Sequence, residues 1–203
     1  MQVKDMFLKN EKYSFIFLGI IFFLICPKAF SVEDDRTRVS NYLNSLKHFS
    51  ASFLQNDGEN LSEGKVYIGK ERIRAEYFYP TKILLILDQN KAMYYNYELE
   101  EDEFFNPKDT NAWFFYEIFR NPVFFLDSLL EVQNNELIIE KNGVNIEGSR
   151  YLIRVIFEKN PITLRGVEFF FNEDFLKLSI YNHNYNEDFD EGFFKLINPK
   201  FLN

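Results

Sequence analysis

The hydrophobic positions of this chain follow a helical period near its start and a period of two along most of the rest. From Val39 to Phe49 the apolar side chains recur at the spacing of an amphipathic helix, and acidic residues 33–35 precede it, where they suit the helix dipole. Short alternating runs separated by turn residues then predict strands. The expected strands are 49–55, 64–69, 72–79, 83–88, 91–97, 102–105, 136–141, 150–158, 164–172, 176–183 and 192–197.

The segment 110–130 interrupts the strand pattern. Thr110 or Asn111 can cap a short helix that carries several aromatic residues, and Asn121-Pro122 is a typical start signal for a second helix over 122–130. The segment is strongly apolar, but charged residues and a proline interrupt it, so it lacks the roughly 20 continuous apolar residues of a membrane span. Further along, Asn142-Gly143 predicts a tight hairpin turn.

Several predicted strands are apolar on both faces, which indicates the fold class. In 150–158, for example, Tyr151, Ile153 and Val155 alternate with Leu152 and Ile156. A half-solvated sheet shows one polar face, so these strands need cover on both sides or a cavity on one. Packing on the first helix accounts for part of this pattern. We predict an α+β fold: an unclosed antiparallel β-barrel of about eleven strands, with an N-terminal helix and short apolar lid helices.

The N-terminus has the pattern of a cleavable export signal. Lys4, Lys9 and Lys12 precede an apolar core over 14–26, and Ala29 and Ser31 supply the small residues of a cleavage site. We therefore predict a signal peptide over 1–31 and one domain over 32–203; an uncleaved anchor is the alternative. Cys26 lies inside the apolar core after Ile25, which argues against a lipid-modified cysteine.

Charge and composition narrow the classes of partner. The chain carries a formal net charge of −8, and residues 1–31 hold four lysines and two acidic side chains, so the predicted domain carries −10. Such a surface makes nucleic acid an unfavourable partner and suits a basic docking partner.

Signals for catalysis, metals or cofactors are weak. His48 and His183 lie far apart, and none of the metalloprotease, nucleophile-elbow, phosphate-loop or paired-cysteine motifs is present. The acidic runs at 98–103 and 186–192 are read as solvated hairpin ends, since the second departs from a calcium loop. We expect no enzyme activity, no metal and no cofactor. A hydrolase built on scattered carboxylates is the catalytic alternative.

Spaced motifs along the predicted domain resemble the LolA family of periplasmic lipoprotein carriers. Residues 49–55 (FSASFLQ) are similar to the family's F-x-A-x-F-x-Q, and 73–77 (IRAEY) followed by Pro80 resemble its L-R-F-E-Y…P. Residues 64–68 resemble its next strand, and 94–97 an aromatic strand of the family. Residues 121–130 resemble its proline-led lid helix, and 194–199 its closing strand.

This resemblance implies a periplasmic chaperone whose apolar cavity takes the acyl chains of lipoproteins. It would collect them at an inner-membrane ABC transporter and deliver them to an outer-membrane lipoprotein receptor, and we expect it to act as a monomer. Such a role would explain the apolar 114–130 segment as a lid. The residues expected to line the cavity and lid are Phe53, Tyr77, Tyr95, Phe114, Phe115, Phe119, Phe125 and Leu129.

One departure from the family concerns the closing of the lid. The family has an Arg-Pro pair before its L-R-F-E-Y strand, and its arginine is implicated in holding the lid shut; here the stretch reads Gly69-Lys70-Glu71-Arg72. Lys70 is the closest match in position and Arg72 in chemistry, so gating is placed on Lys70, Arg72 and Arg74. Lysine would not replace arginine neutrally, because arginine's planar fork can bind several carbonyls at once.

Two other functions are compatible with this pattern of apolar strands. A lipidated receptor of the same fold is disfavoured, because no cysteine is placed to accept the lipid. A periplasmic binding protein for free lipid or another apolar ligand, without any hand-off of lipoprotein, remains the alternative.

Overall fold

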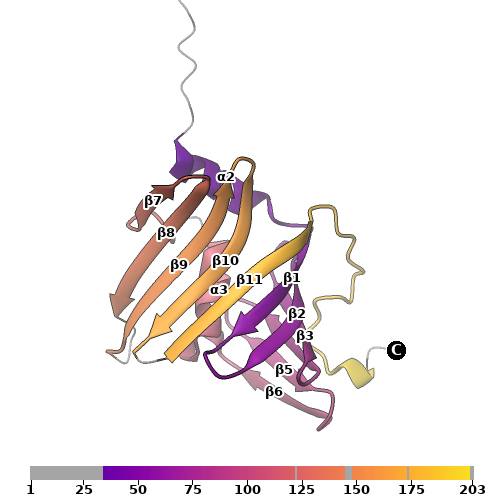
Figure 1. The fold of residues 1–203 in the computed structure, drawn as a ribbon. Coiled ribbons are helices and arrows are strands. Elements are labelled where there is room, and N and C mark those ends of the chain that lie inside the picture. The colour runs from indigo at the N-terminus through magenta and orange to yellow at the C-terminus, as the bar shows by residue number, and fades with distance from the viewer. Residues whose placement is uncertain (1–33, 122, 145–147, 173, 202–203) are drawn as a thin grey trace, which may run out of the picture. The chain divides into compact units, whose positions relative to one another are not determined.

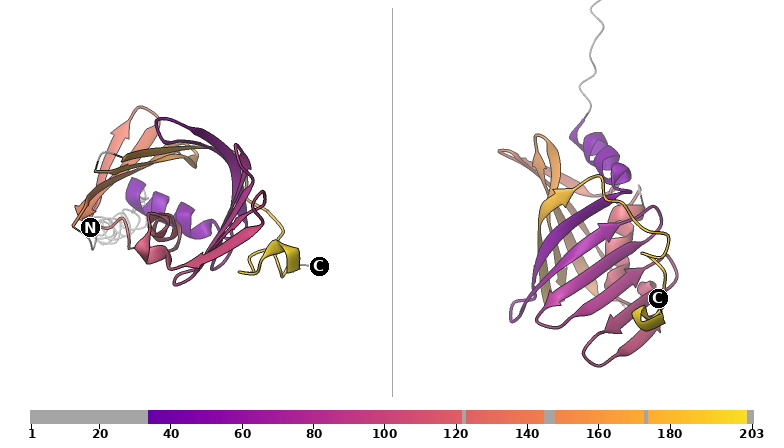
Figure 2. Two further views of the ribbon diagram at one scale, coloured as in Figure 1. Left: turned by 90° about the horizontal axis from the view of Figure 1, so that it is seen from below. Right: turned by 90° about the vertical axis from the view of Figure 1, so that its right-hand side faces the viewer.

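The computed structural model describes residues 34–121, 123–144, 148–172 and 174–201. The predicted signal peptide and its cleavage site lie outside these residues. Within them, one antiparallel sheet holds eleven strands, and α2 (Asp35–Ser45) and α3 (Ala112–Arg120) lie on its concave side (Figures 1 and 2). Two short 3-10 turns, η1 (Pro107–Asp109) and η2 (Pro199–Phe201), complete the elements. The predicted α+β open barrel is confirmed.

The sheet consists of two meanders joined in its middle. The first meander contains β1 (Phe49–Asn56), β2 (Leu61–Ile68), β3 (Ile73–Tyr79), β4 (Ile83–Leu87), β5 (Ala92–Asn96) and β6 (Glu101–Phe105). The second contains β7 (Leu129–Gln133), β8 (Glu136–Val144), β9 (Arg150–Lys159), β10 (Ile162–Phe171) and β11 (Asp174–Asn184). Strands β1 and β11 pair, so β6 and β7 become the two free edges.

This topology fixes the place of α3. The chain leaves the free edge β6 and must reach the free edge β7, so residues 106–128 cross the open side of the curled sheet. Figure 2 shows α3 on that open side, with α2 beside it on the concave face.

Helix α2 forms for the reasons visible in the sequence. Asp34 caps it by accepting hydrogen bonds from the backbone N–H groups of Arg36 (2.9 Å) and Thr37 (3.1 Å). Its apolar face buries Val39 and Leu43 against the sheet. The helix therefore covers one end of the concave face.

The concave face holds the main core. Alternate side chains from β1 to β4 and from β8 to β11 point to this face and are buried with α2 and α3. A second, smaller cluster of Leu84, Ile86, Met93 and Tyr95 lies apart from it, and Tyr97 and Leu196 pack against it. In the register of β4 with β5, Leu84 faces Tyr95 and Ile86 faces Met93, so these four residues share the face opposite to Leu85 and Leu87.

Three sequence-based expectations about elements are wrong. Residues 123–128 form successive turns and Leu129 begins β7, so the predicted helix over 122–130 does not form. Asn142-Gly143 lies inside β8 because β8 continues its pairing with β9 as far as Val144. Residues 192–194 belong to a turn, and residues 195–197 do not form a strand either.

No helix among the described residues is long and apolar enough to cross a membrane. The same residues contain no group of histidine, cysteine or acidic side chains arranged to hold a metal ion.

The bend of the first meander requires a glycine at position 64. The register of β2 with β3 shifts between Glu63 and Gly64, and a Cβ at Gly64 would collide with the Glu76 carbonyl oxygen and the Phe53 ring. We expect Gly64→Ala to lower the free energy of unfolding by about 1–3 kcal/mol, because the backbone and a core ring must both move. Gly192→Ala, where a Cβ meets no heavy atom within 4 Å, is the control in the same denaturant titration. Equal stability of the two variants would contradict this reading.

Candidate functional site

The concave face encloses a small and wholly apolar cavity. Its volume is about 50 Å³, and strands from both meanders contribute to it together with α3. The lining residues are Phe53, Val66, Ile73, Ala75, Tyr77, Leu85, Leu87, Phe115, Phe119, Val167, Leu178 and Ile180. The one polar group on these side chains, the Tyr77 hydroxyl, donates a hydrogen bond to Gln55 Oε1 at 2.9 Å. The cavity therefore suits an apolar ligand and offers nothing to a polar one.

Helix α3 supplies two aromatic rings to the wall of this cavity. Phe115 and Phe119 lie one turn apart on the same face of α3, and both line the cavity. The Phe115 ring contacts Phe169 with a centroid separation of 4.8 Å, and Phe114 contacts Tyr151 at 4.7 Å. A volume of about 50 Å³ has room for a few water molecules at most, so a long alkyl chain can enter only if α3 moves.

The cavity is flanked by a hollow at each end of α3. Phe119 also lines a hollow of about 190 Å³ between α2, α3 and the 123–128 turns. Phe115 also lines an open hollow of about 700 Å³ near the start of α3. Each ring therefore lines both the apolar inner cavity and one of the two hollows, whose walls also carry polar side chains.

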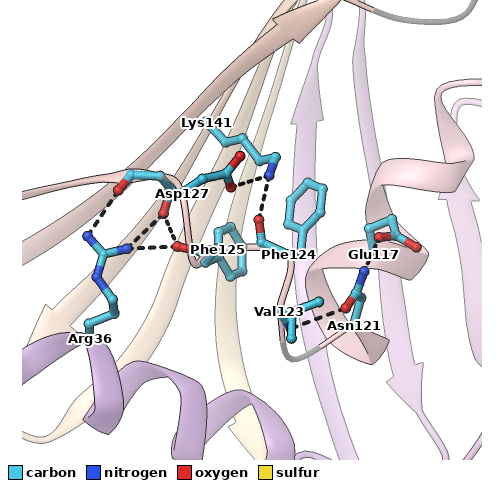
Figure 3. Close-up of polar contacts among 9 residues, drawn as sticks. Arg36, Glu117, Asn121, Val123, Phe124, Phe125, Asp127 and Lys141 are labelled. Carbon is cyan, nitrogen blue, oxygen red and sulfur yellow. Dashed lines mark hydrogen bonds and ion pairs between the residues drawn. The ribbon is translucent and has the colours of Figure 1, made fainter.

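Two cations fasten the 123–128 turns that follow α3, as Figure 3 shows. Arg36 of α2 donates hydrogen bonds to the carbonyl oxygens of Phe125 (2.7 Å) and Ser128 (2.9 Å). Lys141 of β8 donates to the Phe124 carbonyl oxygen (2.7 Å) and forms an ion pair with Asp127 (2.6 Å). The Lys141 ammonium holds the pKa of Asp127 below its usual value, so that pair is ionised near neutral pH.

A third cation belongs to α3 itself. The Arg120 guanidinium donates to the Gly69 carbonyl oxygen in the β2–β3 turn and, at 3.4–3.5 Å, to the Leu46 carbonyl oxygen after α2. Burial lowers the pKa of Arg120, and its Nε has no hydrogen-bond partner among the described atoms. The fork geometry of arginine thus ties the end of α3 to two separate parts of the fold.

The structure brings together part of the predicted ligand-binding set. Phe53, Tyr77, Phe115 and Phe119 line the inner cavity, and Phe125 lines the hollow beside α2. Phe114 is buried on the aromatic rings of β9 and β10.

Two predicted cavity residues lie elsewhere. Leu129 is 66% exposed at the start of the edge strand β7. Tyr95 belongs to the second cluster, on the opposite face of the sheet. Because β5 is apolar on both faces, its sequence does not show which side chains point to the concave face.

The predicted gating residues contact a different segment. Arg72 pairs with Asp88 (2.7 Å) and donates to the Phe194 carbonyl oxygen (3.1 Å). Arg74 pairs with Glu76 (2.5 Å) and donates to the Phe193 carbonyl oxygen (2.6 Å). Lys70 is exposed. The two arginines thus hold the C-terminal segment, whereas contacts with α3 and the turns after it come from Arg120, Arg36 and Lys141.

Sequence reasoning missed these three cations for a definite reason. Each of the three binds at least one main-chain carbonyl oxygen, and such a contact leaves no pattern in the amino-acid sequence. The one available signal was Arg120 itself, a cation placed at the end of an otherwise apolar helix.

Comparison with known proteins supports the fold. An uncharacterized conserved protein from Thermus thermophilus matches over 81% of this chain and 92% of its own, with a TM-score of 0.52 and 13% identity. More distant are MucB of Pseudomonas aeruginosa, solved with MucA (TM-score 0.41, 9% identity, 72% of this chain and 56% of that one), and LprF of Mycobacterium bovis (0.35, 8%, 77% and 94%). No protein-family model and no curated protein matches the sequence.

Removal of the α3 anchor provides a test of this geometry. We expect the backbone amides of α3 in Arg120→Leu to exchange with deuterium roughly tenfold to a hundredfold faster, because hydrogen bonds from a charged donor contribute about 1.5–3 kcal/mol. Arg72→Leu, which removes an arginine bound to the C-terminal segment, is the matched control and should leave α3 unchanged. Equal exchange in α3 of both variants would show that Arg120 does not hold the helix.

Proposed function

We propose that this protein is a non-enzymatic carrier that binds the acyl chains of lipoproteins beneath α3 and escorts them from the inner to the outer membrane of the cell envelope. The observation that carries the proposal is the apolar cavity, which is lined by two rings of α3 on the segment that crosses the open side of the sheet. The resemblance to the LolA motifs supports the same role.

The energetics favour exchange of the two rings for a lipid. Burial of one methylene contributes about 0.8 kcal/mol, so a sixteen-carbon chain gains roughly 12 kcal/mol on leaving water. Exposure of Phe115 and Phe119 would cost about 1.5–3 kcal/mol each. Hydrogen bonds broken at the Arg120 anchor would add a few kcal/mol. The free energy gained by burying one acyl chain therefore exceeds the free energy lost on opening the lid. The net gain is smaller than the burial term alone, which suits a carrier that must release its cargo.

The proposed partners follow from this role. Loading from the inner membrane requires an ABC transporter, since a lipid anchor leaves the bilayer only at a large cost in free energy. Unloading requires an outer-membrane receptor that takes the chains in turn. The acidic surface suits basic docking sites on both partners.

A release assay tests the carrier role. Spheroplasts displaying a newly made, tagged lipoprotein receive the purified protein, with a known lipoprotein carrier as the positive control and the native transporter co-expressed. We expect the lipoprotein in the soluble fraction as a one-to-one complex with the protein. Retention in the membrane while the control works would reject the carrier role and leave a binder of free lipid.

Photocrosslinking tests where the chains bind. A photoreactive phenylalanine analogue at position 119 faces the inner cavity and should crosslink to the acyl chains of a bound lipoprotein. The same analogue at Trp113, whose ring stacks on Tyr116 at 5.5 Å and does not line the cavity, is the matched control. Crosslinks of equal yield at both positions would exclude the cavity as the binding site.

A further inference from the structure

The open hollow near the start of α3 has the form of an entrance. Its volume is about 700 Å³, and it lies where the turn after β1, the start of α3 and the strands β10 and β11 meet. Its lining residues are Asp57, Gly58, Glu59, Asn111, Phe115, Phe169, Phe171, Asp174, Phe175 and Leu176. We call this hollow the mouth.

The floor of the mouth is apolar and continues into the inner cavity. Phe169, Phe171 and Leu176 form part of this floor, and Phe115 lines both the mouth and the inner cavity. The Phe115 ring thus belongs to the walls of both spaces, and we expect a rotation of this ring or a shift of α3 to join them. The hollow at the other end of α3 lies between the helix and the turns that Arg36 and Lys141 fasten, so that end is the more strongly held.

The rim of the mouth is negatively charged. Asp57, Glu59 and Asp174 are all exposed, and the described residues that line the mouth include no lysine, arginine or histidine. Backbone N–H groups of Asn60 and Glu59 donate to Asp57 and keep its pKa below the usual value, so this carboxylate is ionised near neutral pH.

Among the described parts of the mouth, the positive end of the α3 dipole opposes the acidic side chains. It amounts to about half an elementary charge, and the N–H groups of Ala112, Trp113 and Phe114 already donate to Thr110 and Asn111. Three acidic side chains line the mouth against this half charge, so the field there is unfavourable to anions.

We infer that apolar chains enter through this mouth, that the polar end of the ligand remains there, and that the carboxylate rim excludes ligands with an anionic end group. This inference rests on the proposed function and names its substrate class: lipid moieties with an uncharged or cationic end. The lipid anchor of an acylated polypeptide carries no phosphate and passes this filter. Fatty-acid anions and acidic phospholipids do not.

Three ligands with the same twelve-carbon chain test this selection. Dodecyltrimethylammonium, dodecyl maltoside and dodecanoate are titrated calorimetrically into the purified protein below their micellar concentrations, at pH 8 and low ionic strength. We expect the cationic and nonionic ligands to bind at least roughly tenfold more tightly than dodecanoate, and the difference to shrink in 0.5 M salt. Binding of all three with equal affinity would overturn the selection and leave the apolar site intact. Binding of none would overturn the proposed function itself.

A charge-reversal pair assigns the selection to the mouth. Glu59→Lys with Asp174→Lys should remove or invert the preference against dodecanoate, a change of roughly tenfold in the ratio of affinities. Glu101→Lys with Glu103→Lys alters net charge by the same amount on the exposed edge strand β6 and is the control. An equal effect of both double variants would mean that the overall charge of the protein, and not the mouth, excludes anions.

Discussion

The pairing of β1 with β11 is the constraint on which the rest of this structure depends. Because of this pairing, the first and the last strand of the chain lie side by side in the middle of the sheet, and β6 and β7 are its free edges. Since β7 follows β6 in the chain, the segment between them must connect the two edges. A connection between the two edges of a curled sheet crosses its open side. The apolar character of residues 112–130 follows, because this crossing lies over a concave face that is lined with hydrophobic side chains.

The crossing segment is held by two kinds of interaction that differ in how they can be released. Phe115 and Phe119 bury apolar surface, a contact that an alkyl chain could also make. The cations Arg36, Arg120 and Lys141 bind main-chain carbonyl oxygens, which a lipid cannot replace. Under the proposed function, an apolar ligand would compete with the rings, and the cationic contacts would be the part that resists opening.

The sequence predicted the fold well because periodicity and burial agree along most strands. Errors arose where tertiary pairing decided the outcome. Asn121-Pro122 is a good helix start signal, but strand β8 offers Leu129 and the residues after it a partner, and pairing prevails over local propensity. The count of eleven strands is right because β7, which was not predicted, replaces the strand expected at 192–197.

The site was predictable in its chemistry and less so in its geometry. An aromatic cavity followed from strands that are apolar on both faces. The sequence of such a strand does not show which of its two faces is the concave one. For this reason Tyr95 was predicted to line the cavity, whereas it lies on the opposite face, where Leu196 of the C-terminal segment packs against its cluster. The rim of the mouth could not be predicted at all, because Asp57 and Glu59 follow β1 and Asp174 begins β11, and these positions meet only when β1 and β11 pair.

The two ends of α3 are held by different contacts. At its C-terminal end Arg120 ties the helix to the main chain at Leu46 and Gly69, and the turns beyond it are fastened by Arg36 and Lys141. At its N-terminal end Asn111 makes no side-chain capping hydrogen bond. The N–H groups of its first turn bond instead to the neighbouring Thr110 and Asn111, whereas Arg120 reaches distant main chain, so we expect local opening to begin at the N-terminal end. That end lies at the acidic mouth, so under the proposed function the part of α3 expected to open most readily is also the part that would meet the ligand.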